Sequence, residues 1–132
     1  MLGIDTNVLV RVVVDDDPAQ CLRARRLIDA TVAQGEAIFV SLLVLLEFEW
    51  VARSRYGFAK AEILDVISRL LDSVELVFED EPAIEEALFQ WRDCRADFAD
   101  CLIGVRNRRL GCRATATFDA KAARLPAYEA VR

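Results

Sequence analysis

The 132-residue chain is predicted to fold as a single α/β domain, residues 1–132, with a mostly parallel central sheet and helices on both faces. Short apolar runs of strand length alternate with longer segments whose apolar residues recur at helical spacing. Parallel strands need crossover connections, which helices supply. Hydrophobic residues make up 55% of the chain, beside 5 Gly and 3 Pro, so the composition is that of a folded core rather than of a disordered segment.

The N-terminal part is predicted to be a strand followed by two helices. Residues 2–4 form the apolar run of the strand. Residues 8–14 are rich in valine, which favours a strand, but the Asp-Thr-Asn sequence before them offers three good helix caps, and we favour a helix. A second helix is expected from Pro18, because proline suits the first turn of a helix and follows an aspartate-rich turn.

The middle of the chain is predicted to contain a buried strand and two helices. The strand covers residues 37–40, and Ser41 is placed to cap a helix over residues 42–55. Gly57 ends that helix. Apolar residues at positions i, i+3, i+4 and i+7 over residues 63–71 then mark the buried face of the next helix.

The C-terminal part is predicted to contain two strands and two helices. Residues 74–78 alternate as a strand, and Asp80 is the expected cap of the helix that follows. Asp97 is expected to begin the last long helix, which ends near Leu110. Residues 113–118 read as a strand, and a short tail closes the chain.

Several functional classes are excluded by composition. The chain has no histidine, which removes Ser-His-Asp triads and every histidine general base. Its 4 cysteines have no C-x-x-C spacing and are expected to be reduced core thiols. A net charge of −5 argues against nucleic-acid binding through a bulk basic field. No apolar run is long enough for a membrane helix and no secretory signal is visible, so we expect a cytoplasmic protein without membrane contact.

Several aspartates lie at the ends of predicted strands and at the start of a predicted helix, and structural roles do not account for all of them. Asp5 and Asp119 each follow a predicted strand, and ligands of parallel sheets bind beyond the carboxyl ends of the strands. Asp97 and Asp100 lie three residues apart at a helix start, where capping accounts for Asp97 more readily than for Asp100.

Glu47 and Glu49 lie in an otherwise apolar helix. They point about 200° apart, so both cannot share its solvated face. Converging carboxylates repel one another unless a cation lies between them. With no histidine and no paired cysteines, Mg²⁺ or Mn²⁺ is the cation that such oxygen ligands favour, rather than zinc.

These acids lie in four motifs that resemble, in order and spacing, those of PIN-domain ribonucleases, in particular the VapC toxins of type II toxin-antitoxin pairs. The motifs are Asp5-Thr6-Asn7-Val8-Leu9, Leu46-Glu47-Phe48-Glu49-Trp50-Val51, Asp97-Phe98-Ala99-Asp100 and Ala116-Thr117-Phe118-Asp119. The resemblance implies a three-layer PIN-like fold and an acidic catalytic site made of Asp5, Glu47, Asp100 and Asp119. It implies supporting roles for Thr6, Asn7, Asp97 and Thr117.

The resemblance also implies Mg²⁺-dependent hydrolysis of RNA phosphodiester bonds, with Asp5, Asp100 and Asp119 as metal ligands. Glu47 is left as either a ligand or the group that orients water. A VapB-like antitoxin is the implied partner, and a homodimer the implied assembly. Arg11, close to the first motif, is the preferred RNA-binding residue. The other candidate arginines are Arg23, Arg25, Arg26, Arg106, Arg108 and Arg109.

Two alternatives remain at this stage. One is a noncatalytic module that keeps the fold and binds protein. The other is a phosphatase with Asp5 as nucleophile. Such enzymes typically carry a second aspartate two residues later, where this chain has Asn7.

Overall fold

The computed structural model describes residues 1–132, which form two compact units. Unit 1 is Met1–Glu79 and unit 2 is Asp80–Arg132. None of the helices combines the length and the apolar character that crossing a bilayer requires. The prediction of one domain over the whole chain stays a prediction.

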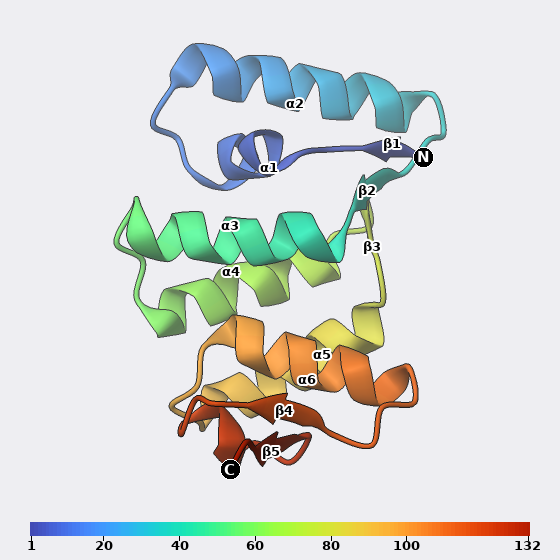
Figure 1. Cartoon of the computed structure of the whole chain (residues 1–132). Helices are drawn as coiled ribbons and strands as arrows, with labels where there is room; N and C mark the ends of the chain where they lie inside the picture. Colours follow the sequence, from blue (N-terminus) through green and yellow to red (C-terminus); the bar gives the residue numbers. More distant parts are fainter. The chain divides into compact units, whose positions relative to one another are not determined.

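Unit 1 is a parallel sheet of three strands with four helices. Its elements are β1 (Leu2–Gly3), α1 (Thr6–Val13), α2 (Pro18–Ala33), β2 (Ile38–Val40), α3 (Leu42–Ser54), α4 (Lys60–Asp72) and β3 (Leu76–Phe78). The strand order is β1-β2-β3, with both neighbouring pairs parallel, and Ile38 pairs with both Leu2 and Leu76. In Figure 1, α2 lies above β1, whereas α3 and α4 lie below it. Helices therefore lie on both sides of this strand.

Side-chain caps define where the helices of unit 1 begin. The side chain of Asp17 accepts a hydrogen bond from the Gln20 N–H at 3.1 Å, one residue before Pro18 opens α2. The Ser41 hydroxyl accepts from the Val44 N–H at 3.2 Å and begins α3. The valine-rich segment is a helix, as predicted, because capping and burial outweigh the weak strand preference of valine.

The core of unit 1 lies between its helices and its sheet. Ile38 and Val40 of β2 are fully buried, and the largest buried side chain is Phe48 of α3. The predicted apolar stripe of α4 is part of this core, since Ile63 and Ile67 are fully buried as well. These side chains are removed from water, which is the main stabilising contribution to such a fold.

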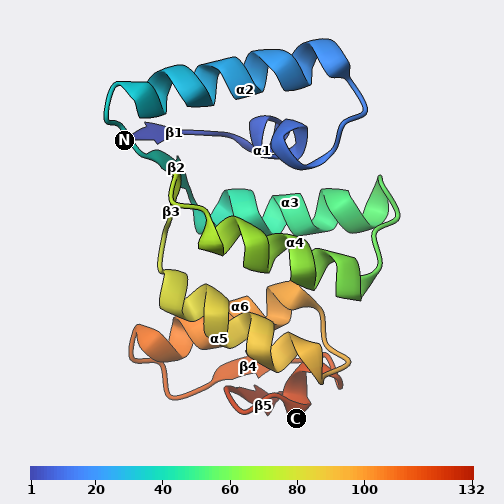
Figure 2. The ribbon, with the colours of Figure 1, turned by 180° about the vertical axis from the view of Figure 1, so that it is seen from behind.

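Unit 2 contains a helix pair and a two-stranded sheet (Figure 2). Its elements are α5 (Glu81–Arg92), α6 (Phe98–Arg109), β4 (Thr115–Thr117), the short 3-10 helix η1 (Ala122–Arg124) and β5 (Tyr128–Ala130). β4 and β5 pair in parallel, with Thr115 opposite Tyr128. The sequence patterns indicated β4 but not β5, which lies in what was expected to be a tail.

The helices of unit 2 pack through aromatic rings. Trp91 at the end of α5 and Phe98 at the start of α6 have ring centroids 5.3 Å apart. Phe98 is fully buried, and Leu102 of α6 is 2% exposed. Unit 2 therefore has an apolar core of its own, as a compact unit requires.

The four cysteines form no disulfide. Cys101 is fully buried in α6, and its sulfur lies 3.5 Å from that of Cys94. Cys112 is exposed, so the expectation of core thiols is wrong for this residue. Cys112 follows Gly111, whose φ of +98° carries the chain out of α6.

Asp80 does not cap α5 in the predicted way. It has a left-handed backbone, with a φ of +50°, and its side chain makes no capping hydrogen bond. Its carboxylate instead accepts from Arg106 at 2.9 Å and from Arg109 at 3.2 Å. Two arginines from the far end of α6 therefore hold the start of α5, a long-range pairing that local sequence signals do not show.

Candidate active site

Asp5 sits where β1 leads into α1. Its Oδ1 accepts a hydrogen bond from the Val8 N–H at 3.0 Å, so the carboxylate caps α1. The side chain is nevertheless exposed, which leaves the other oxygen available to a ligand. Thr6 is 7% exposed and Asn7 is exposed. The first motif therefore places one carboxylate at the carboxyl end of a strand, in agreement with its predicted position.

The two glutamates of α3 face opposite ways, as their spacing predicts. Glu47 is exposed, whereas Glu49 is 3% exposed. The Glu49 Oε2 accepts from the Arg53 Nε at 3.1 Å, one helical turn later. Glu49 is thus explained by burial and pairing, and Glu47 is the one left free for chemistry.

Asp97 and Asp100 are held together at the start of α6. Asp97 occupies the cap position, and its backbone N–H donates to the Asp100 Oδ2 at 3.4 Å. Burial raises the pKa of Asp100, the hydrogen bond from Asp97 opposes the rise, and the charges of Asp97 and Asp119 add to it. Asp97 and Asp119 therefore each lie close enough to Asp100 for their negative charges to act on it.

The environment of Asp119, unlike that of Asp100, favours the ionised carboxylate. Its Oδ1 accepts backbone hydrogen bonds from Lys121 at 2.7 Å and Ala122 at 3.0 Å. The pKa of Asp119 is lowered chiefly by the N–H groups of Ala122 and Lys121. The Thr117 hydroxyl accepts from the Asp119 N–H at 3.0 Å and so orients the same turn. Asp119 stays ionised more readily than Asp100, and the pKa values of the two neighbours are pulled apart.

Tyr128 of β5 anchors the Asp100 segment. Its hydroxyl donates to the Asp100 carbonyl at 2.6 Å, and burial raises the pKa of Tyr128 to about 12, so the hydroxyl keeps its proton. A Cβ on Gly104 would lie 2.5 Å from the Tyr128 ring, which explains why α6 has a glycine there. Neither residue was predicted from the sequence. The only sequence signal is a glycine inside a helix, four residues after Asp100.

Arg11 is engaged within unit 1. Its guanidinium donates to Gln20 at 2.6 Å, to Asp16 at 2.8 Å and to Tyr56 at 3.3 Å. The bond to Tyr56 raises the pKa of Arg11, and the charge of Asp16 adds to the rise. The role of Arg11 in RNA binding stays a prediction, and binding RNA there would replace partners that the guanidinium already has.

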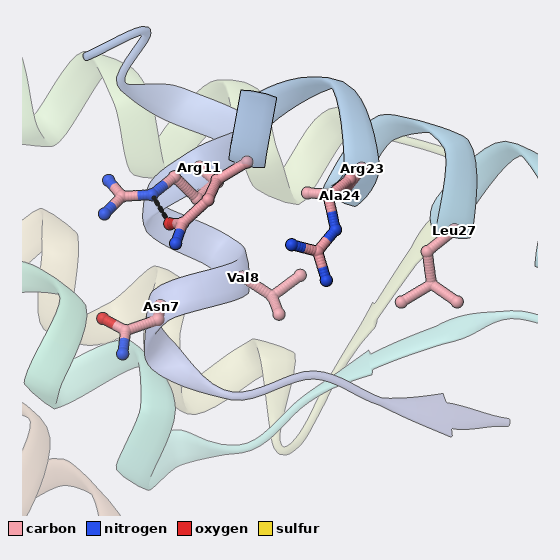
Figure 3. Close-up of a pocket in the computed structure, with 7 residues that line it drawn as sticks. Asn7, Val8, Arg11, Arg23, Ala24 and Leu27 are labelled. Carbon is pink, nitrogen blue, oxygen red and sulfur yellow. Dashed lines mark hydrogen bonds between the residues drawn. The ribbon is translucent and has the colours of Figure 1, made fainter. Parts of the chain in front are cut away.

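Arg11 also lines a pocket between α1 and α2 (Figure 3). The pocket encloses about 380 Å³, and Arg23, Val8 and Leu27 point into it. Asn7 of the first motif stands at its edge. Arg23 makes no ion pair, so it is the cation of this pocket that remains open to a ligand.

The donor chemistry of these residues suits a hard cation. The candidate ligands are all carboxylates, and Asp100 and Asp119 repel each other in a way that a cation between them would relieve. No group of three or more acidic or cysteine side chains converges as a ready metal site. Unit 2 brings Asp97, Asp100 and Asp119 together, whereas Asp5 and Glu47 belong to unit 1.

Two comparisons with known proteins point in the same direction. The family model of the PIN domain matches residues 3–128, which takes in all four acidic motifs. A VapC ribonuclease of Aquifex aeolicus (strain VF5) is 26% identical over 85 residues, or 64% of this chain. The match spans 63% of that relative's own length.

The family model covers nearly the whole chain, and the parallel strands with intervening helices agree with the predicted α/β architecture. The resemblance inferred from the motifs is confirmed at this level. The chain belongs to the PIN domain family.

Proposed function

We propose that this protein is a Mg²⁺-dependent endoribonuclease, with Mn²⁺ as an alternative ion, and the toxin of a VapBC-type pair. The observation that carries the proposal is that two PIN motifs bring Asp97 and Asp119 near enough to Asp100 for their charges to act on it. The VapC ribonuclease relative supports RNA as the substrate. In this proposal, Asp5 and Glu47 of unit 1 are also required for cleavage.

The residues of unit 2 would have distinct tasks. Asp119, kept ionised by two N–H groups, would be a permanent negative ligand. Asp100 would be the second ligand, and the Tyr128 hydrogen bond to its carbonyl would hold the start of α6 in place. Asp97 and Thr117 would support these two acids through backbone hydrogen bonds. Asp5, with one oxygen in the α1 cap, would supply the third carboxylate.

A bound divalent ion would supply an acidic water and offset the charge that develops on the phosphate. Glu47 is exposed and without an ion pair, so it is free either to bind the ion or to orient water. No histidine base is needed for this chemistry, which agrees with the composition. The protein's part is to hold its carboxylates in fixed positions and to bind the RNA strand.

The antitoxin and the homodimer are part of the same proposal. Leu43 and Trp50 lie seven residues apart on α3 and are 78% and 54% exposed. Apolar side chains at this spacing form one helix face, of the kind that a partner helix covers. Co-expression with a small VapB-like protein encoded beside this chain is expected to yield a stable complex, measured by light scattering. Recovery of the chain alone under these conditions would count against the pair.

The test of the enzymatic function is cleavage of total RNA with Mg²⁺, followed by mapping of the cut ends. The unaltered chain is expected to cut at discrete sites, and Asp5→Asn to lose this activity, because the amide keeps the shape of the side chain but loses its charge. Asp65→Asn, at an exposed position of α4, is the matched control and should cut normally.

The two alternative functions give different results in this experiment. A noncatalytic module would give no metal-dependent cleavage of any RNA by the unaltered chain. An aspartyl phosphatase would instead form a phosphoenzyme on Asp5. Either result would replace the proposed function.

A further inference from the structure

A pocket in unit 2 gathers positive charge. It encloses about 530 Å³, a volume typical of ligand sites, between the turn after α5 and the segment around η1. Arg95, Lys121 and Arg124 line it, against the acid Asp93, and the buried Leu125 adds an apolar surface. We call these residues the cationic pocket.

None of the three cations of the cationic pocket is in a salt bridge. Most other basic residues of unit 2 are in salt bridges. Those in salt bridges are Arg106 and Arg109 with Asp80, Arg108 with Glu86, and Arg113 with Glu129. Arg95, Lys121 and Arg124 are exposed and form no salt bridge. Three like charges in one pocket repel one another, so the arrangement favours an anionic ligand.

The cationic pocket shares its chain segments with the acids of unit 2. Lys121 and Arg124 follow Asp119 in the turn that its carboxylate caps. Arg95 stands two residues before Asp97 and five before Asp100. The cations and the acids are therefore neighbours in unit 2.

We propose that the cationic pocket binds a backbone phosphate of single-stranded RNA next to the bond that is cut. This inference rests on the proposed function, because it assigns a position on the RNA that the acidic site would hydrolyse. A guanidinium binds phosphate oxygens with two parallel hydrogen bonds, and Arg95 and Arg124 offer two such groups. RNA carries one charge per nucleotide, so a strand with one phosphate at Asp100 and Asp119 presents the next phosphate to the same segments. Leu125 offers an apolar surface to the sugar or base.

The experiment measures RNA binding without cleavage. A labelled single-stranded RNA of about 12 nucleotides is titrated in EDTA, between about 20 and 200 mM salt, with fluorescence anisotropy as the readout. The test variant carries Arg95→Gln, Lys121→Gln and Arg124→Gln. The control carries Arg69→Gln, Arg113→Gln and Arg132→Gln, which removes the same total charge elsewhere. Circular dichroism checks that both variants are folded.

Removing the charges of the cationic pocket is expected to weaken binding roughly 10- to 100-fold at low salt. The slope of log Kd against log salt should fall by about 0.7 for each phosphate that the variant no longer binds. At about 150 mM salt the control should change binding less than about threefold, because the Debye length is then about 8 Å and charges away from the RNA are screened. With Mg²⁺, the pocket variant should show a raised KM and a nearly unchanged kcat.

The results separate this inference from the proposed function. Equal binding by the pocket variant and the control overturns the inference, whether or not the unaltered chain cuts RNA. Absence of RNA binding by the unaltered chain at the lowest salt also overturns it. Pocket-dependent binding without Mg²⁺-dependent cleavage supports the pocket and overturns the proposed function. If a polyglutamate peptide competes as well as RNA of equal charge, the ligand is an acidic protein segment and the RNA assignment is wrong.

Discussion

Unit 1 and unit 2 distribute charge in opposite ways. Unit 1 has 13 acidic and 8 basic residues, so it carries all of the chain's formal charge of −5, whereas unit 2 has nine of each and is neutral. In unit 1 the predicted RNA-binding Arg11 is held by Asp16. In unit 2 three cations stand unpaired in one pocket beside the acids. The net charge of a chain therefore says little about where it binds a polyanion.

The units also use their acids differently. Asp5 caps a helix, as many surface aspartates do. Burial and two nearby negative charges disfavour the ionised form of Asp100, whereas backbone N–H groups stabilise the ionised form of its neighbour Asp119. Groups with pKa values pulled apart in this way are typical of catalytic sites. The contrast places the stronger evidence for chemistry in unit 2.

The largest effect on the free energy of unfolding is expected from removing the buried phenylalanine ring in the core of each unit. Phe48→Ala in unit 1 and Phe98→Ala in unit 2 should each lower the free energy of unfolding by about 3–5 kcal/mol, because each leaves a cavity in a buried site. Phe118→Ala, at a ring that is 90% exposed, should change it by less than about 0.5 kcal/mol. Urea denaturation measures all three. A small loss for either core ring would mean that its unit has no core of its own.

The next effect concerns the glycine beneath Tyr128. Gly104→Ala should destabilise the protein by about 1–3 kcal/mol, since the added Cβ pushes the ring that holds the Asp100 segment. It should also slow RNA cleavage. Gly3→Ala in β1 is the control, because nothing lies within 4 Å of the added atom. Equal Tm values for Gly104→Ala and the unaltered chain would show that the ring moves aside freely.

The two glutamates of α3 should separate stability from activity. Glu49→Gln should lower the free energy of unfolding by about 1 kcal/mol, since it weakens a pair whose arginine is half exposed, and it should keep RNA cleavage. Glu47→Gln should leave stability unchanged and lose cleavage. Thermal unfolding and RNA assays on both variants test this. The reverse pattern would move the site acid from Glu47 to Glu49.

The smallest effects are those of pH on stability. Asp100→Asn should raise Tm at pH 7, because folding disfavours the Asp100 anion, and the gain should vanish as the pH falls and Asp100 takes up its proton. Asp119→Asn should lower Tm at pH 7, because folding favours the Asp119 anion. That loss should disappear as the pH falls through the lowered pKa of Asp119. Calorimetry from pH 7 down to about pH 2 measures both, and shifts of equal sign at pH 7 would contradict the assigned environments.

Local signals in the sequence predicted most elements of the fold. Caps such as Asp17 and Ser41 mark helix starts because their side chains accept from N–H groups three residues away. β5 was missed because three residues that pair only with β4 have no periodicity to detect. Asp80 occupies the predicted cap position of α5 but makes no side-chain capping bond, because the partners of its carboxylate come from the far end of α6.

For the candidate site as well, features set by neighbouring residues were predictable and those set by long-range contacts were not. The positions of the acids at strand and helix ends were predictable, since they depend on neighbouring residues. The predicted arginine track included Arg106, Arg108 and Arg109, and each of the three forms a salt bridge with Asp80 or Glu86. The cationic pocket was not predicted, because Arg95 and Arg124 are 29 positions apart and only folding brings them together.

The proposed function requires that Asp5 and Asp100 act in the same cleavage reaction, and a double-mutant cycle on RNA cleavage tests this requirement most directly. Asp5→Asn and Asp100→Asn should each reduce kcat/KM by more than about 100-fold, and the double variant should be little worse than either single one, because parts of one catalytic unit are not additive. Full activity in either single variant, or losses that multiply in the double variant, would contradict this requirement.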